Sequence, residues 1–225
     1  MENVQVADNK VNDTYRHSVI VTALAKIISI VFHPLFIPLY VAYYLVFVHD
    51  SYFTGYSDKA RSWVLIRIAL NMVFFPAITV LLLKGVGFID SIYLRSQKDR
   101  IIPYMAAGIF FFWMYLVFRN QTEIPQILTA FTFGAFLASS VALIANIYFK
   151  ISMHAIGCGG MIGLMIVVLN TNPSSPFTLP LMIAIVITGL VSTARLIVSD
   201  HKQGDIYMGL FSGFFCQFVS AAFIL

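Results

Sequence analysis

Apolar residues fall in long, nearly uninterrupted runs along this chain, not at the three-and-four-residue spacing of an amphipathic surface helix. A membrane-spanning helix needs about 20 mostly apolar residues, and seven segments approach that length. They are residues 19–48, 63–83, 101–118, 127–149, 153–169, 177–198 and 206–225. The pattern therefore predicts an all-α integral membrane protein, a bundle of about six to seven transmembrane helices.

The first of these segments, residues 19–48, is longer than one span requires. It contains Lys26, His33, Pro34 and Pro38, and proline breaks or kinks a helix because it lacks an N–H group and clashes with the preceding turn. Two interpretations are open: an interfacial helix that leads into a span, or one tilted and kinked helix.

Composition supports the bilayer as the solvent of this chain. Hydrophobic residues make up 60% of it and charged residues only 11%, whereas soluble domains carry roughly 25% charged residues. The net charge of +4 is too small and too scattered to indicate nucleic acid. Residues 1–17 form a polar tail without the basic and apolar regions of a secretory signal. Because the connections are short, residues 18–225 are expected to form a single transmembrane helical domain.

Alternating spans sort the polar stretches onto two faces of the membrane. Face A receives the N-terminus and residues 84–100, 149–152 and 199–205, whereas face B receives residues 49–62, 119–125, 170–176 and the C-terminus. Ten of the 14 Lys and Arg residues belong to face A, which the positive-inside rule would make cytoplasmic. Six of those ten lie in the stretches that form the candidate site described next, so the orientation stays open.

The clearest chemical stretch joins the last two spans and contains Arg195, His201 and Asp205. His201 and Asp205 are four residues apart, so we expect them to share one helical face. A carboxylate there can hold the imidazole in one tautomer and stabilise its cationic form. Arg195 supplies a planar cationic fork that suits phosphate oxygens.

Two upstream stretches return to the same face, each separated from the next by a two-span hairpin. Taken alone, each is typical of interfacial anchors or of a headgroup-binding cluster. Each stretch, however, directly precedes a span that starts from face A, and helix N-termini favour phosphate. Two imidazoles add a nucleophile and a proton donor. The residues are Lys150, Ser152 and His154 in one stretch and Arg95, Lys98 and Arg100 in the other.

The last stretch resembles the third motif of the type 2 phosphatidic acid phosphatase (PAP2) superfamily, Ser-Arg-x5-His-x3-Asp. Arg195, His201 and Asp205 keep the spacing of that motif, and Ala194 replaces the leading Ser. Glycines that often follow in the family stand at positions 209 and 213, where small residues let a neighbouring helix approach closely.

The other two motifs of the superfamily match less completely. In the second, Pro-Ser-Gly-His, Ser152 and His154 keep their places and Ile151 and Met153 replace the Pro and Gly.

When the proline of the first motif, Lys-x6-Arg-Pro, is aligned with Pro103, Arg95 stands in the Lys place and Ile102 in the Arg place. Arg100 or Lys98 would then substitute for the missing cation from a neighbouring turn.

The resemblance implies a phosphatase that acts on a phosphorylated lipid without a metal or cofactor. His201 would attack phosphorus and form a phosphohistidine, Asp205 would orient it, and His154 would protonate the leaving oxygen and then activate water. Phosphatidate, phosphatidylglycerol phosphate, polyprenyl diphosphate and lipid A phosphates all remain as substrates. The expected phosphate-binding residues are Arg195, Ser152, Arg100, Arg95, Lys98 and Lys150.

Other functions stay open at this point. A relative with weakened motifs would bind or transport a phosphorylated lipid without cleaving it. An intramembrane prenyltransferase needs a second cluster of Asp residues, which this chain lacks, and a channel or transporter would carry more polar residues in its spans. The expected location is the inner membrane of a bacterium, with the site on the face of the N-terminus. Partners other than membrane lipids and the lipid substrate, and the oligomeric state, are not indicated.

Overall fold

The computed structural model describes residues 17–49, 51–94, 96–171, 178–199 and 201–225, and within these ranges every regular element is helical. Six helical segments are long and apolar enough to cross a membrane, which confirms the expected all-α membrane bundle. The polar tail lies almost entirely outside the described residues. The six segments are Asp58–Gly85, Gln97–Arg119, Gln126–Tyr148, Met153–Thr171, Thr178–Val198 and Gln203–Ile224.

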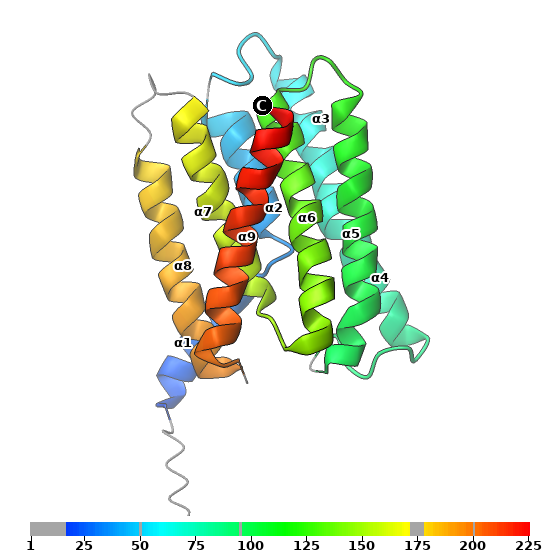
Figure 1. Ribbon diagram of the computed structural model, residues 1–225, viewed down its shortest axis with the longest axis vertical. Coiled ribbons are helices and arrows are strands. Elements are labelled where there is room, and N and C mark those ends of the chain that lie inside the picture. Colours follow the sequence, from blue (N-terminus) through cyan, green and yellow to red (C-terminus); the bar gives the residue numbers. More distant parts are fainter. Residues whose placement is uncertain (1–16, 50, 95, 172–177, 200) are drawn as a thin grey trace, which may run out of the picture.

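The long helices run alternately up and down the bundle (Figure 1). α5 (Gln97–Arg119), α7 (Met153–Thr171) and α9 (Gln203–Ile224) all start at the end where α6 (Gln126–Tyr148) and α8 (Thr178–Val198) finish. This end is face A, and the C-terminus lies at the opposite end, face B. Three of the polar stretches therefore meet at one end of the molecule, as the alternation of spans predicts.

The remaining span is interrupted by a π-helical stretch. It consists of α3 (Asp58–Ile68), the π-helix η2 (Ala69–Phe74) and α4 (Phe75–Gly85). Phe75 stacks on Phe110 of α5 with ring centroids 5.4 Å apart, which attaches this outer span to the rest of the bundle.

The first apolar segment is two short helices, not one continuous span. α1 (Val19–Val31) packs against α8, and after a turn at residues 32–36 the chain continues as α2 (Ile37–Tyr43) and the π-helix η1 (Tyr44–Val48). Pro34 causes the break because it lacks an N–H group and disfavours helical geometry in the residue before it. The carbonyl of His33 accepts the N–H of Phe36 at 2.8 Å, so the turn satisfies backbone groups that the proline leaves out of a helix.

α7 and α9 pack in direct backbone contact. A Cβ built on Gly213 would lie 2.0 Å from the carbonyl oxygen of Ile156, and one on Gly159 would lie 2.1 Å from that of Leu210. Only glycine permits such backbone contact, which is the close approach predicted from the small residues of α9. The starts of α7 and α9 are consequently held against each other at face A.

Two of the helices at face A start before the apolar runs do. α5 begins at Gln97 instead of residue 101, and α9 begins at Gln203 instead of residue 206. Ser96 caps α5 by accepting the N–H of Asp99 at 3.1 Å, and such caps, not hydrophobicity, mark where a helix starts. Polar residues expected in loops therefore lie in first helical turns.

Candidate functional site

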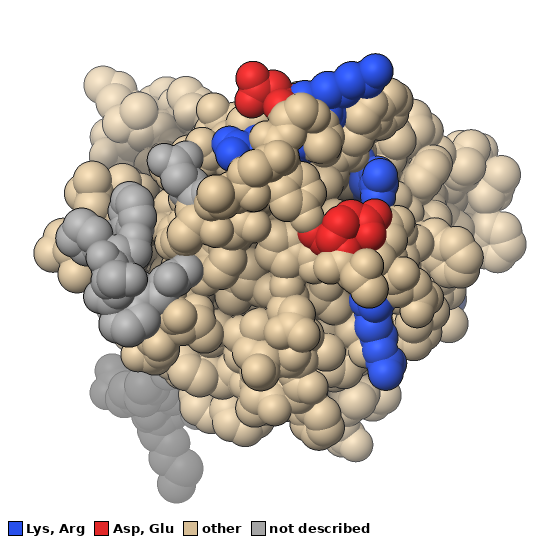
Figure 2. Space-filling view, turned by 90° about the horizontal axis from the view of Figure 1, so that it is seen from above, with Lys and Arg blue, Asp and Glu red and all other residues tan. Residues whose placement is uncertain are grey.

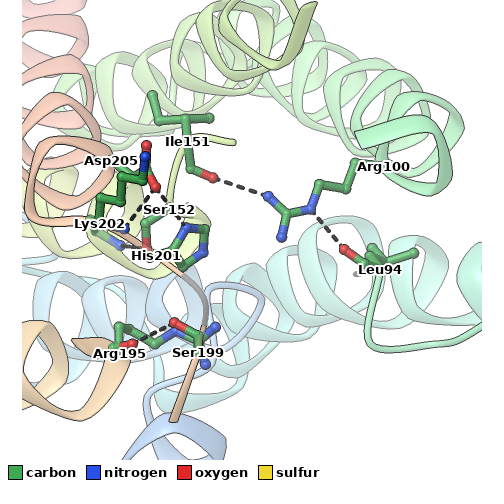
Figure 3. Close-up of polar contacts among 10 residues, drawn as sticks. Leu94, Arg100, Ile151, Ser152, Arg195, Ser199, His201, Lys202 and Asp205 are labelled. Carbon is green, nitrogen blue, oxygen red and sulfur yellow. Dashed lines mark hydrogen bonds and ion pairs between the residues drawn. The ribbon is translucent and has the colours of Figure 1, made fainter. Parts of the chain in front are cut away.

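The polar residues at face A come together where α5, α7 and α9 begin and α8 ends. Figure 3 shows His201 and Ser152 side by side, with the Arg195 and Arg100 guanidinium groups on different sides of them. The residues come from four helices far apart in the sequence. The packing of α7 on α9 and the reversal of the chain after α8 account for the convergence.

His201 and Asp205 meet at the start of α9, but not on one helical face as expected. His201 precedes Lys202, the N-cap residue, and so lies outside the helix, whereas Asp205 lies in its first turn. The Asp205 carboxylate accepts the N–H of Lys202 at 2.9 Å. Its Oδ2 atom lies 3.6 Å from His201 Nδ1, which is too far for a hydrogen bond. Helix capping, not the four-residue spacing, thus sets the geometry of this pair.

His201 itself is buried, with 8% of its surface exposed, and its Nδ1 atom has no hydrogen-bond partner among the described residues. Burial lowers the pKa of His201, and the positive charges of Arg100, Arg195 and Lys150 lower it further, while Asp205 opposes them. The imidazole is therefore neutral at neutral pH and keeps a lone pair on one nitrogen.

Ser152 connects α7 to α9. It is fully buried, its N–H donates to the carbonyl of Asp205 at 3.3 Å, and its hydroxyl accepts the N–H of Ala155 at 3.5 Å in the first turn of α7. The hydroxyl thus lies at a helix N-terminus directly beside His201 (Figure 3).

Of the two described cations of the first stretch, Arg100 is the one that the fold turns inward. Its side chain is buried and donates from Nε to the carbonyl of Leu94 at 2.8 Å and from Nη1 to the carbonyl of Ile151 at 3.2 Å. Lys98 is exposed, and Arg95 lies outside the described residues. Of the two substitutes considered for the missing motif cation, Arg100 is therefore the one that reaches the other polar residues.

Arg195 and Lys150 complete the positive charge of the site. Arg195 stands in the last turn of α8, half-buried, and its Nε atom is buried without a hydrogen-bond partner in the described part of the chain. Ser199 ends the helix by bonding the Arg195 carbonyl with both its N–H and its hydroxyl. Lys150 is half-buried before α7, and its charge acts on His201.

His154 faces α1 as well as the site. Its Nε2 atom lies 3.0 Å from the carbonyl oxygen of Ser29. Because a carbonyl only accepts hydrogen bonds, Nε2 carries the proton and Nδ1 of the neutral ring is the free acceptor. Arg195 and His201 both act on His154 electrostatically, which places the second imidazole within reach of the same charges.

Two residues of this neighbourhood were not predicted from the sequence, Ser29 and His33. The ring of His33 contacts that of His154 edge to face, with centroids 5.4 Å apart and an interplanar angle of 81°. The available signal was the histidine directly before Pro34, at the break of the first segment.

The described residues contain no group of three His, Cys, Asp or Glu side chains that could hold a metal ion. Comparison with protein-family models, with curated proteins and with solved structures finds no match to this chain.

Proposed function

We propose that this protein is a metal-independent lipid phosphatase of the inner membrane of a bacterium, which hydrolyses a lipid phosphate or diphosphate through a phosphohistidine on His201. The observation that carries the proposal is the neutral, buried imidazole of His201 near the guanidinium groups of Arg100 and Arg195. A phosphoryl group needs both a nucleophile and fixed positive charge, and phosphate transfer depends mainly on such positioning and electrostatic stabilisation.

The first step would transfer the phosphoryl group to His201. Nδ1 faces Asp205, so the attacking lone pair is that of Nε2, and the Nδ1 proton moves toward the carboxylate as positive charge develops on the ring. The bond from phosphorus to the leaving oxygen breaks, and His154, which takes up a proton at Nδ1 from the acidic phosphate group of the bound substrate, donates that proton to the leaving oxygen. Distances such as the 3.6 Å between His201 and Asp205 commonly shorten once substrate is bound.

The second step would release inorganic phosphate. His154, now neutral, removes a proton from water through Nδ1, and the water oxygen attacks phosphorus as the bond to His201 Nε2 breaks. Both imidazoles return to their starting states. Arg100, Arg195 and the Ser152 hydroxyl would hold the phosphoryl oxygens in both steps, and one set of residues thus serves two easier displacements.

The resemblance to the type 2 phosphatidic acid phosphatases supports the same assignment from the sequence. Arg195, His201 and Asp205 keep the spacing of the third motif, and Ser152 and His154 keep two places of the second. These five residues gather at face A together with Arg100 and Lys150.

A second function, binding or transport of a phosphorylated lipid without cleavage, is favoured by one observation. The Asp205 carboxylate is engaged with the N–H of Lys202, and His201 Nδ1 has no hydrogen bond among the described residues. In such a protein the cations would bind the headgroup and the imidazole would not be activated.

The experiment that separates the two functions uses purified protein in detergent micelles that contain phosphatidate or a polyprenyl diphosphate, with a chelator present. We expect free phosphate to appear. Brief exposure to ³²P-labelled substrate should leave label on the protein that resists alkali and is lost in acid, as a phosphoramidate is. Saturable binding of the lipid without phosphate release would favour the binding protein, and release that requires added Mg²⁺ would contradict the metal-independent mechanism.

A further inference from the structure

The end of α1 and the break that follows it supply two contacts to the ring of His154. The Ser29 carbonyl accepts from Nε2 at 3.0 Å, and the His33 ring packs edge to face at 5.4 Å. This segment is thus placed to control one imidazole, and the proposed mechanism leaves both of its residues without a role.

His33 is itself held in a defined orientation. Its Nδ1 atom accepts the N–H of Leu35 at 3.3 Å, and its carbonyl accepts the N–H of Phe36 at 2.8 Å. The ring is therefore tied to the turn that Pro34 imposes, and it also packs against the ring of Phe36 with centroids 6.1 Å apart. A side chain fixed in this way provides a rigid surface against which a neighbouring ring can pack.

We infer that His33 is a positioning residue, which together with the Ser29 carbonyl holds His154 in the Nε2–H tautomer so that Nδ1 is the nitrogen that exchanges a proton with substrate. This inference rests on the proposed function, because it names how the acid–base residue of that reaction is oriented. An imidazole that is free to flip about its ring torsion presents either nitrogen, and a hydrogen bond at one nitrogen selects the tautomer.

The surroundings of His154 agree with that role. The groups that act on it are Arg195 from α8, His33 and the Ser29 carbonyl from the α1 side, and His201 from the segment before α9. The Ser29 carbonyl accepts from the Nε2–H group of both the neutral and the cationic ring. Rotation of the ring away from Ser29 would remove that support from the form that donates a proton.

Three variants separate ring positioning from other roles of His33. His33→Phe keeps an aromatic ring against His154 but has no nitrogen, whereas His33→Asn keeps a side-chain acceptor for the Leu35 N–H but has no ring. His17 is exposed near the start of α1, so His17→Asn is a matched control. We expect kcat for phosphate release to fall about 10- to 100-fold in His33→Asn with little change in KM, part of the 10²–10⁴-fold that acid–base help supplies. His33→Phe should stay within about 3-fold of wild type, because it keeps an aromatic ring packed against His154.

Imidazole ¹⁵N chemical shifts test the inference without turnover. We expect the His154 resonances, identified by their loss in His154→Gln, to show the Nε2–H tautomer in wild type and His33→Phe, and a mixture of tautomers in His33→Asn. An unchanged tautomer and unchanged kcat in His33→Asn would overturn the inference, as would equal loss of activity and melting temperature in the Asn and Phe variants. Absence of phosphate release from wild type would instead contradict the proposed function.

Discussion

The two ends of the bundle use the same residue types in different ways. At face B, which Figure 2 views from above, a few charged side chains of both signs lie on a largely uncharged surface. The arginines of this end donate to protein oxygens. They pair as Arg61 with the Phe53 carbonyl at 2.8 Å, Arg67 with Gln121 Oε1 at 2.6 Å and Arg119 with the Tyr115 hydroxyl at 3.1 Å.

At face A two unpaired buried polar atoms belong to one site, whereas at face B the unpaired Arg61 Nε atom belongs to a guanidinium that also bonds the Phe53 carbonyl. Arg195 Nε and His201 Nδ1 are both buried without a hydrogen-bond partner among the described residues. An unsatisfied buried polar group costs about 1–3 kcal/mol, and a ligand bound at the site is one source of the missing partner. A guanidinium and an imidazole with unpaired atoms at one site thus make face A the candidate for chemistry, and the bonded guanidinium of Arg100 adds positive charge there.

The largest effect that separates the two ends should come from their histidines. Face B has a buried histidine of its own, His49, which stacks on Tyr52 with ring centroids 4.6 Å apart. We expect His201→Ala to abolish phosphate release, a loss beyond the 10²–10⁴-fold of acid–base help alone, while the protein stays folded in the membrane. His49→Ala should lower stability by roughly 0.5–3 kcal/mol and leave the turnover of the folded fraction unchanged. Phosphate release and thermal unfolding, measured on both purified variants, test this prediction. Near-normal phosphate release from His201→Ala would contradict the assignment of His201 as the nucleophile.

The second-largest effect on activity should come from a comparison of arginines at the two ends. Arg195→Gln should reduce kcat/KM by about 10²–10³-fold, the cost of losing one donor to a developing negative charge. Arg67→Gln removes a guanidinium that is bonded to Gln121 at face B, so it should change melting temperature and not kcat/KM. Equal losses of activity in the two variants would mean that the ends do not differ in the way described.

The contact between α7 and α9 tests whether face A depends on packing deeper in the bundle. Gly213→Ala puts a methyl group 2.0 Å from the Ile156 carbonyl oxygen, so we expect a loss of about 1–3 kcal/mol of stability, as for other overpacked sites. Gly189 in α8 has open space around it, and Gly189→Ala should be tolerated. Thermal unfolding compares them, and equal stability of the two variants would contradict the close approach of α7 and α9.

The smallest expected effect is a shift in pH dependence. The lowered pKa of His201 means that kcat/KM should begin to fall only below pH 6.5, when the free enzyme protonates its nucleophile. After burial, the charge of Arg100 is the largest cause of the lowering, so Arg100→Gln should move this acidic limb to higher pH, while Arg67→Gln should not. A limb that stays in place in Arg100→Gln would show that the two side chains are not coupled.

The same pKa shift affects stability in a defined direction. His201 takes up protons less readily in the folded protein than in the unfolded chain, so its contribution is complete above the unfolded pKa of 6.5. That contribution is lost as the pH falls from 6.5 toward the lower pKa of the folded state. Thermal unfolding of wild type and His201→Ala over this pH range should therefore converge toward acid.

Most of the candidate site could be predicted from the sequence because the alternation of spans already decides which stretches share an end. That logic brought Arg195, His201 and Ser152 together without any knowledge of packing. It did not predict that Lys98 faces outward while Arg100 faces inward, since this depends on where the first turn of α5 begins. Ser96 sets that start as its N-cap, and the apolar run begins one turn later.

The contribution of α1 could not be predicted from local pattern. Ser29 meets His154 across 125 positions of sequence, and neither residue belongs to a motif that points to the other. Pro34 predicted a break in the first segment, but the direction of the chain after the break follows from the packing of α1 on α8 and of α2 on α7.

By itself, the sequence determined that the chain folds in a lipid bilayer, that it is helical, and at which end of the bundle each polar stretch emerges. Long apolar runs leave the bilayer as the only place where backbone groups are satisfied within helices, and each crossing reverses the direction of the chain. Only the tertiary structure decided which polar atoms are left unpaired and which nitrogen of His154 is bonded. Those outcomes depend on helix caps, glycine contacts and side-chain orientations that arise after the helices pack against one another.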